Sequence, residues 1–346
     1  MIYIRTDMNN TIATGHVMRC LSIADAAKNA GEDTTFLLAD EQAVGLIEKH
    51  GYHTIVLHTK WNDMEQELPI LDTLIQTYQI KNMLIDSYQV TKTYLSRLSA
   101  QTKIFYIDDR NAFSYPVHAL ICYANYYEKF DYPSHYANTE LYLGPQYAPL
   151  RTEFAFCNSK SIKPKAETLL LMSGGSDSYD VLPQLLENLS PEAFKHIDVI
   201  CGIYHSRYDE LKKKYAPHKS IHIQKAVSNI ADYMKQADLA VSAGGTILYE
   251  LCAVGTPAIS YIIADNQWDN VVSFQNQNMI DYAGDMRENP AGTIQTILQK
   301  ISEYKENFVL RTKRSQKMQS LVDGRGAFRI ARIFTGSGAS STAENK

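Results

Sequence analysis

The sequence of 346 residues lacks long apolar runs, and this absence excludes a membrane-spanning protein. No stretch approaches the roughly 20 apolar residues that a spanning helix requires. The amino terminus carries charges at Arg5 and Asp7, too early for the apolar segment of a secretory signal. We therefore expect a cytoplasmic protein with no integral membrane segment.

The sequence also lacks paired cysteines and basic clusters. Its five cysteines are scattered, odd in number and without a C-x-x-C pair, which argues against a disulfide framework and a structural zinc site. Reduced, mostly buried thiols are the expectation. Lys and Arg number 34 against 38 Asp and Glu, and no basic run suits a phosphate backbone. We expect no nucleic-acid partner.

What the sequence does contain is typical of two globular domains. Hydrophobic residues make up 45% and charged residues 21%, which excludes disorder for most of the length. At roughly 150 residues a domain, the chain is long enough for two cores. Aromatics are unevenly distributed, with 23 Tyr against 11 Phe and 2 Trp, so we expect either a wet aromatic surface or a polar cleft lined by tyrosines.

Short apolar runs alternate with segments of helical periodicity in both halves, which predicts α/β domains with parallel sheets covered on both faces. The predicted strands are Ile2–Arg5, Thr34–Leu38, His53–Leu57, Asn82–Ile85, Lys103–Ile107, Thr168–Met172, Asp198–Gly202, Ser220–Ile223, Leu239–Ser242 and Ala258–Ile263. The segment 123–165 is rich in Tyr, Pro, Asn and Ser and is interpreted as the crossing between domains.

The predicted organisation is an N-terminal domain over 1–150, a C-terminal domain over 151–322, a helix over 323–335 and a small polar tail over 336–346. The tail is interpreted either as disordered or as a remnant of expression.

The first candidate site lies in DMNNTIATGHVMR, after the first strand. Gly15 allows a tight turn and His16 falls in the first turn of a helix, where the positive end of the helix dipole favours a neutral imidazole that can accept a proton. Asp7 is a candidate to orient that imidazole. Arg19 shares the helix face of His16 and, with Gly15, is a candidate to contact a substrate phosphate, with a solvated side chain as the alternative for Arg19. Helix capping by His16 and turn formation by Asp7 are the alternatives.

Two glycine turns in the second half lie between a strand and a helix, where free backbone N–H groups bind anions. SGGSD offers Gly174, Gly175 and Ser176, with a plain turn as the alternative. Neither a P-loop nor a dinucleotide-binding glycine pattern is present.

The second glycine turn, SAGGTILYE, is the stronger of the two. Gly244 and Gly245 precede a helix that begins at Thr246, and Glu250 shares a face with Thr246, so a phosphate and a ribose fit together there. Asn266, in the later ADNQ segment, is expected at the same sheet edge.

The remaining carboxylates are less persuasive. Asp86, Asp108 and Asp109 follow predicted strands, where Asp is common as a turn former. No metal site and no cofactor are predicted. Tyr88, close to Asp86, is a candidate for the polar cleft.

Three motifs in order, D-x(7)-G-H-x-x-R, L-x-S-G-G-S-D and S-x-G-G-T-x-x-x-E followed by G-x-P and A-D-N-Q, resemble one family. They look like those of the UDP-2,4-diacetamido-2,4,6-trideoxy-β-L-altropyranose hydrolases of pseudaminic acid biosynthesis, relatives of the lipid II-forming N-acetylglucosaminyltransferase. The resemblance runs from Arg5 to about Phe334. It implies two Rossmann-like domains of the glycosyltransferase B type, with the active site in the cleft between them.

The resemblance implies roles for particular residues. His16 corresponds to the histidine that activates water, and Asp7, Gly15 and Arg19 belong to the same signature. Tyr88 falls where the family has a tyrosine near the sugar. The remaining implied positions are the diphosphate loop, Ser242, Gly244, Gly245 and Thr246, then the ribose-binding Glu250 and Asn266 of ADNQ. Ala13 departs from the family's G-x-G pattern.

The implied reaction is inverting hydrolysis of a UDP-sugar, the predicted small-molecule partner, with C–O cleavage and no metal. Three rivals remain open: a glycosyltransferase with an acceptor, a nucleotide-sugar epimerase of the same fold, and a non-catalytic nucleotide-sugar binding protein.

Overall fold

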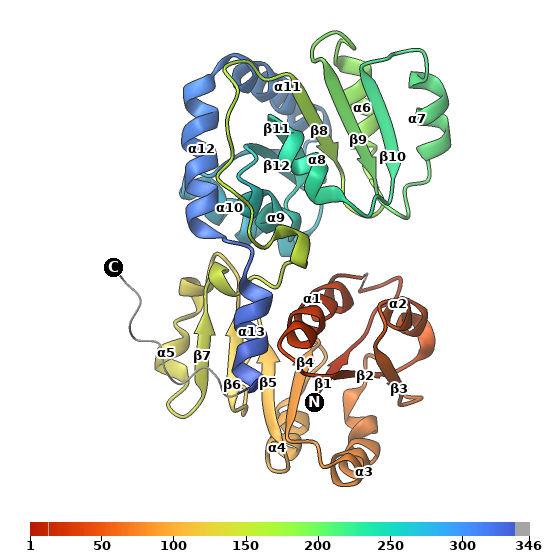
Figure 1. The fold of residues 1–346 in the computed structure, drawn as a ribbon, viewed down its shortest axis with the longest axis vertical. Helices are drawn as coiled ribbons and strands as arrows, with labels where there is room; N and C mark the ends of the chain where they lie inside the picture. The colour runs from red at the N-terminus through yellow and green to blue at the C-terminus, as the bar shows by residue number, and fades with distance from the viewer. Residues whose placement is uncertain (13, 336–346) are drawn as a thin grey trace. The chain divides into compact units, whose positions relative to one another are not determined.

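The computed structural model describes residues 1–12 and 14–335. Ala13 and the predicted tail, 336–346, lie outside the described residues. The chain divides into two compact units, one formed by 1–152 together with the segment from Gly324 onward, and the other by 153–323. Each unit contains one parallel sheet, and both are labelled in Figure 1.

The first unit is built on a sheet of seven strands in the order β3-β2-β1-β4-β5-β6-β7, and each strand is parallel to its neighbours. Its strands are β1 (Ile2–Thr6), β2 (Thr34–Leu38), β3 (His53–Val56), β4 (Asn82–Asp86), β5 (Lys103–Ile107), β6 (Ala119–Cys122) and β7 (Glu140–Leu143). Its helices are α1 (Gly15–Asn29), α2 (Val44–Lys49), α3 (Leu68–Tyr78), α4 (Lys92–Ser99), α5 (Tyr132–His135) and α13 (Gly326–Thr335).

Helices cover both faces of this first sheet. On one face, α3 and α4 pack on strand side chains such as Met83 and Ile104. On the other, α13 lies beside α1, and the ring centroids of Phe105 and Phe334 are 4.5 Å apart. The C-terminal helix therefore belongs to the same unit as the amino terminus.

The second unit has a sheet of six parallel strands in the order β10-β9-β8-β11-β12-β13. Its strands are β8 (Thr168–Met172), β9 (His196–Cys201), β10 (Ile221–Lys225), β11 (Leu239–Ala243), β12 (Ala258–Ile262) and β13 (Ile280–Asp285). Its helices are α6 (Val181–Asn188), α7 (Tyr208–Tyr215), α8 (Ile230–Gln236), α9 (Ile247–Val254), α10 (Trp268–Asn276), α11 (Pro290–Glu306) and α12 (Phe308–Leu321).

The ten predicted strands are confirmed, most with ends within one or two residues. The sequence prediction missed β6, β7 and β13, and the interpretation of all of 123–165 as a crossing was wrong, because the first unit continues to Thr152 through the edge strand β7. The expectation of mostly buried thiols is confirmed, since only Cys157 among the five free cysteines is partly exposed.

Candidate functional site

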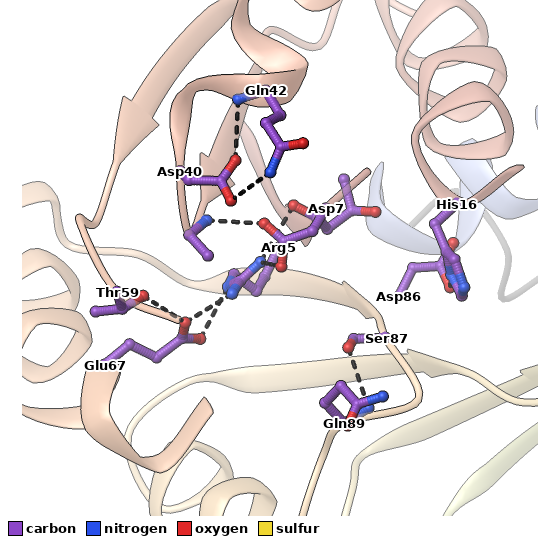
Figure 2. Close-up of polar contacts among 12 residues, drawn as sticks. Arg5, Asp7, His16, Asp40, Gln42, Thr59, Glu67, Asp86, Ser87 and Gln89 are labelled. Atoms are coloured by element: carbon purple, nitrogen blue, oxygen red, sulfur yellow. Dashed lines mark hydrogen bonds and ion pairs between the residues drawn. The ribbon is translucent and has the colours of Figure 1, made fainter. Parts of the chain in front are cut away.

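The imidazole of His16 lies against a carboxylate at the carboxyl edge of the first sheet. Helix α1 begins at Gly15, so His16 occupies its first turn as predicted, and Asp86 is the last residue of β4. Nδ1 of His16 is 2.7 Å from Oδ1 of Asp86, and the two lie together in Figure 2. Strands β1 and β4 are neighbours in the sheet, and β1 pairs with β2 on its other side. The pair therefore lies where the strand order reverses, the usual ligand position in such sheets.

The partner of Nδ1 determines which imidazole nitrogen can act as a base. A carboxylate only accepts hydrogen bonds, so the Asp86 contact requires a proton on Nδ1 of His16. Nη2 of Arg19 lies 2.8 Å from the same nitrogen and only donates, but Nη2 already donates to Oδ1 of Asp86, so we assign the Nδ1 proton to the Asp86 contact. Nε2 is then unprotonated in the neutral ring, and no described residue supplies it with a hydrogen-bond partner. His16 is 7% exposed, which leaves it a small opening to ligand.

Arg19 completes this arrangement one turn further along α1. Its Nε and Nη2 donate to the two oxygens of Asp86, and its Nη1 donates to the hydroxyl of Tyr123 at 2.7 Å. Burial raises the pKa of Asp86, but the charges and hydrogen bonds of Arg19 and His16 outweigh it and hold that pKa well below its usual range. Asp86 is therefore ionised at neutral pH and able to stabilise a protonated His16.

Arg19 was predicted to meet a phosphate or solvent, and its surroundings favour a different role. Its side chain is 11% exposed and its donors face Asp86 and Tyr123. Gly15 does not have the positive φ of a tight glycine turn, and an added Cβ would meet nothing within 4 Å. Both residues thus lie in the His16 site, but neither offers an evident phosphate contact of its own.

Tyr88 forms a second contact with the imidazole and is itself bound to Asp109. The Tyr88 hydroxyl donates to Oδ2 of Asp109 at 2.8 Å, and the Tyr88 ring meets the His16 ring edge-on, with centroids 4.8 Å apart and planes at 80°. Tyr88 therefore lies beside His16, as its prediction in the site requires.

The prediction that Asp7 orients His16 was wrong. Asp7 ends in a different network, shown in Figure 2: its carboxylate accepts from Nη1 of Arg5 and, at 2.8 Å, from the backbone N–H of Ala39. Arg5 also donates to both oxygens of Glu67, at 2.8 and 2.7 Å, and all three side chains are buried. Asp7 thus neutralises a buried arginine and anchors the chain after β2, because an unpaired buried charge would be costly.

In the second unit, the Gly244–Gly245 turn connects β11 to α9 as predicted, but its glycine N–H groups are occupied. That of Gly244 donates to the carbonyl of Tyr261 and that of Gly245 to the carbonyl of Ala243, each at 2.9 Å. The prediction that these two groups bind a diphosphate does not fit this geometry. Within the described chain, the N–H groups of Thr246 and Ile247 have no such acceptor, so they are the donors exposed at the start of α9.

Buried neighbours fix the shape of this turn. The side-chain amide of Asn270 donates to the carbonyl oxygens of Gly244 and Gly245 at 3.0 and 3.3 Å, and its own oxygen accepts from the Tyr249 hydroxyl at 2.8 Å. A Cβ at Gly244 would lie 2.1 Å from Cγ2 of Val271.

Ser242 is fully buried and its hydroxyl donates to the carbonyl of Ala243, so it does not line the loop surface. Glu250 is half-buried in the first turn of α9, the position that the ribose prediction needs. Asn266 is exposed in the 3₁₀ helix Asp265–Gln267.

The SGGSD turn follows β8 as predicted, but the start of its helix is occupied. The carboxylate of Asp177 accepts from the backbone N–H groups of Val181 and Leu182 at 2.9 and 3.0 Å, which leaves α6 without a free anion site at these positions. Gly174, Gly175 and Ser176 are exposed, and Gly174 has a φ of +82° that favours glycine. The turn is open to ligand only through these exposed residues.

Sequence reasoning did not select four residues that shape these sites: Asp86, Asp109, Tyr123 and Asn270. The first two were treated as turn formers, although their position at the ends of neighbouring parallel strands was a signal that could have found them. In the described part of the chain, no three His, Cys, Asp or Glu side chains converge as metal ligands, and no helix is long and apolar enough to cross a bilayer.

Comparisons with known proteins define the class of fold. Residues 169–323 match the glycosyltransferase family 28 C-terminal domain, which covers most of the second unit. The structure aligns with MurG of Acinetobacter baumannii at a TM-score of 0.69, with 11% identity, over 97% of this chain and 99% of that one. The predicted architecture is thereby confirmed: two parallel-sheet α/β domains in the glycosyltransferase B-type fold.

Two relatives are similar to this chain in sequence. The chain is 23% identical over 326 residues to SpsG of Bacillus subtilis, a spore coat polysaccharide biosynthesis protein, and the match covers 92% of this chain and 93% of SpsG. It is 26% identical over 272 residues to an uncharacterized protein of Methanocaldococcus jannaschii, covering 75% of this chain. The chain spans about half the length of that archaeal protein, 54%.

Proposed function

We propose that the protein is a nucleotide-sugar hydrolase that releases UDP from a UDP-linked sugar by attack of water at the anomeric carbon. The observation that carries the proposal is the His16–Asp86–Arg19 arrangement, in which a buried, ionised carboxylate lies against Nδ1 of the imidazole, and we assign Nε2 as the unprotonated nitrogen. Such a nitrogen is a general base, and a base is what activation of water requires. The family 28 match and the likeness to a polysaccharide biosynthesis protein support a nucleotide-sugar substrate.

In the proposed first step, Nε2 of His16 removes a proton from water as its oxygen attacks the anomeric carbon opposite UDP. The oxygen–carbon bond forms while the bond from that carbon to the diphosphate oxygen breaks, and its electron pair leaves with UDP. Asp86 stabilises the imidazolium through Nδ1–H, as a carboxylate does in a catalytic triad. The product sugar has inverted configuration.

The leaving diphosphate gains negative charge in this reaction, and we assign its binding to the start of α9. The N–H groups of Thr246 and Ile247 and the Thr246 hydroxyl are the proposed donors. Glu250 is proposed to bind the ribose hydroxyls, and the exposed Gly174, Gly175, Ser176 and Asn266 remain proposed contacts to the substrate.

For the sugar, we propose a 2,4-diacetamido-2,4,6-trideoxyhexose and a place in pseudaminic acid biosynthesis. This step depends on the three-motif resemblance, to which His16, the SGGSD turn and the Gly244–Gly245 turn belong. Asp7 has no part in the revised proposal.

A glycosyltransferase is the second candidate, because a base at Nε2 of His16 can activate an acceptor hydroxyl as well as water. One experiment separates the candidates: incubation with the UDP-sugar in heavy-oxygen water, without acceptor or added metal, followed by mass spectrometry of both products. The proposal predicts UDP release with the heavy oxygen on the sugar. Label on phosphate would indicate pyrophosphatase chemistry, and no release without an acceptor would favour the transferase or a binding protein; either result overturns the proposal.

A further inference from the structure

A carboxyl group outside the His16–Asp86 pair occupies the neighbouring strand end. Asp109 follows β5, which pairs with β4, so it lies one strand away from Asp86 on the same edge. Its Oδ2 accepts from the Tyr88 hydroxyl at 2.8 Å, whereas its Oδ1 is buried with no hydrogen-bond partner. The charged neighbours that act on Asp109 are Arg19, Asp108 and Asp86.

This carboxyl group is retained at a cost to the folded state. Burial raises the pKa of Asp109, and Asp108 and Asp86 raise it further, while Arg19 and the Tyr88 hydrogen bond oppose them. A buried oxygen without a partner costs about 1–3 kcal/mol in general. The residue is therefore poorly explained by stability alone, and its one side-chain partner, Tyr88, indicates what it does.

Tyr88 needs such a partner to hold its ring in place. It is half-buried in the turn after β4, and its ring packs in a T-shaped arrangement with the His16 ring while the guanidinium carbon of Arg110 lies 5.0 Å from its centroid. The backbone of the turn is fixed separately, since the Gln89 N–H donates to the Ser87 hydroxyl at 3.1 Å (Figure 2). The hydrogen bond to Asp109 is the contact that fixes the far end of the Tyr88 side chain.

We propose that Asp109 is a positioning residue, which acts through the Tyr88 hydroxyl to hold the Tyr88 ring against His16. The imidazole is then fixed by Asp86 at Nδ1 and by the Tyr88 ring, which comes from the turn after β4. The consequence for turnover rests on the proposed function of His16, whereas the geometry itself can be tested without any substrate.

The test is NMR of the His16 ring protons in protein with ¹³C-labelled histidine, assigned with a His16→Gln variant. A Tyr88→Leu variant defines the ring-current shift that the Tyr88 ring imposes on His16. Asp109→Ala and Tyr88→Phe should each lose most of that shift, because each breaks the same hydrogen bond. Asp109→Asn should stay close to the wild type, because its side-chain oxygen can still accept from the hydroxyl.

The chain offers a matched control in a second tyrosine–carboxylate pair, where the Tyr142 hydroxyl donates to Glu140 at 2.6 Å. Glu140→Ala should leave the His16 signals unchanged, and far-UV circular dichroism should show every variant folded. An unshifted His16 signal in Asp109→Ala would overturn the proposal. So would an Asp109→Asn signal displaced as far as that of Asp109→Ala, since charge rather than the hydrogen bond would then be responsible.

A kinetic arm links this geometry to turnover. Asp109→Ala should lower kcat with KM nearly unchanged, and it should cause no further loss in a Tyr88→Phe background. Additive losses would contradict action through Tyr88. If the protein releases no UDP at all, the proposed function fails while the NMR result still decides whether Asp109 positions the ring.

Discussion

The carboxyl edges of the two sheets are organised in opposite ways. At the edge of the first sheet, side chains bond to one another, with His16, Arg19 and Tyr88 all held by carboxylates at the carboxyl ends of β4 and β5. At the edge of the second sheet, two backbone N–H groups at the start of α9 have no acceptor among the described residues. The side-chain amide of buried Asn270 donates to the carbonyl of Gly244 and so fixes the turn before this helix.

Under the proposed function, this difference corresponds to a division of roles between the base and the anion site. Side-chain networks set the protonation state of a base, which suits the chemical step, whereas backbone donors at a helix start suit an anion. Substitutions should therefore act differently in the two units. Removal of a side chain should be most harmful in the first unit, and addition of a methyl group should be most harmful in the second.

The largest expected effect is that of His16→Ala on turnover. Loss of a general base costs about 10²–10⁴-fold in rate, so kcat should fall in that range. The affinity for UDP should be nearly unchanged, because the proposed UDP contacts belong to the second unit. Steady-state kinetics and calorimetric titration with UDP measure the two quantities, and unchanged turnover would contradict the role of His16.

Asp86→Asn should affect both turnover and stability. The neutral amide no longer stabilises the imidazolium, and Arg19 loses its buried counter-ion, which in comparable cases costs about 3–5 kcal/mol. Urea denaturation of both proteins at pH 7 measures the difference in unfolding free energy.

The same pair gives a pH dependence with a definite sign. Burial raises the pKa of Asp86, but Arg19 and His16 lower it by more, so its folded value lies below the ordinary 3.8. The stabilisation from this carboxylate is therefore full well above pH 3.8 and is lost as the pH falls towards the folded value. The stability difference between wild type and Asp86→Asn should shrink as the pH falls below about 4. A difference that stays constant from about pH 4 down to about pH 2 would contradict the ion pair.

In the second unit, two adjacent glycines should respond differently to substitution by alanine. Gly244→Ala would place a Cβ 2.1 Å from Val271, so the turn must shift, at a cost of about 1–3 kcal/mol and with weaker UDP binding. Gly245→Ala meets nothing within 4 Å and has no positive φ, so its melting temperature should match the wild type. Equal melting temperatures for the two variants would argue against this account of the turn.

The smallest effect on turnover is expected for Asp7→Asn. Asp7 serves Arg5 and the backbone of Ala39, so its loss should lower the unfolding free energy by about 1–3 kcal/mol and leave kcat close to wild type. Thermal unfolding and kinetics at a temperature where both proteins are folded provide the measurement. A loss of kcat as large as that of His16→Ala would restore the original prediction for Asp7.

Much of the fold could be predicted because its central strands are apolar runs between helical segments. Strands β2, β5 and β8 were predicted to the residue. Of the three missed strands, β6 is a buried run of only four residues, and β7 and β13 lie at sheet edges. β7 has no fully buried side chain and lies in a Tyr- and Pro-rich segment, so no apolar run marks it. Edge strands bury one side less, and their sequence pattern weakens accordingly.

The candidate site was half predictable. His16 could be found because the G-H pair comes directly before a segment of helical periodicity, and this pattern is visible within a few residues of the sequence. Asp86 could not be ranked above other strand-end carboxylates, because its partner is 70 residues away and only the sheet order brings them together.

The tyrosine excess has a third explanation that composition did not suggest. Many hydroxyls are buried against carboxylates: Tyr94 donates to Glu67 at 2.6 Å, and Tyr115 and Tyr132 both donate to buried Asp108. Tyrosine fills the core of the first unit and satisfies its buried acids at the same time.

The central claim is that Asp86 holds the proton of neutral His16 on Nδ1, so that Nε2 is the base. ¹⁵N NMR of the imidazole in ¹⁵N-histidine-labelled protein at alkaline pH measures which nitrogen carries the proton. We expect a protonated Nδ1 and an unprotonated Nε2, with the preference lost in Asp86→Ala. A proton on Nε2 in the wild-type protein would contradict it.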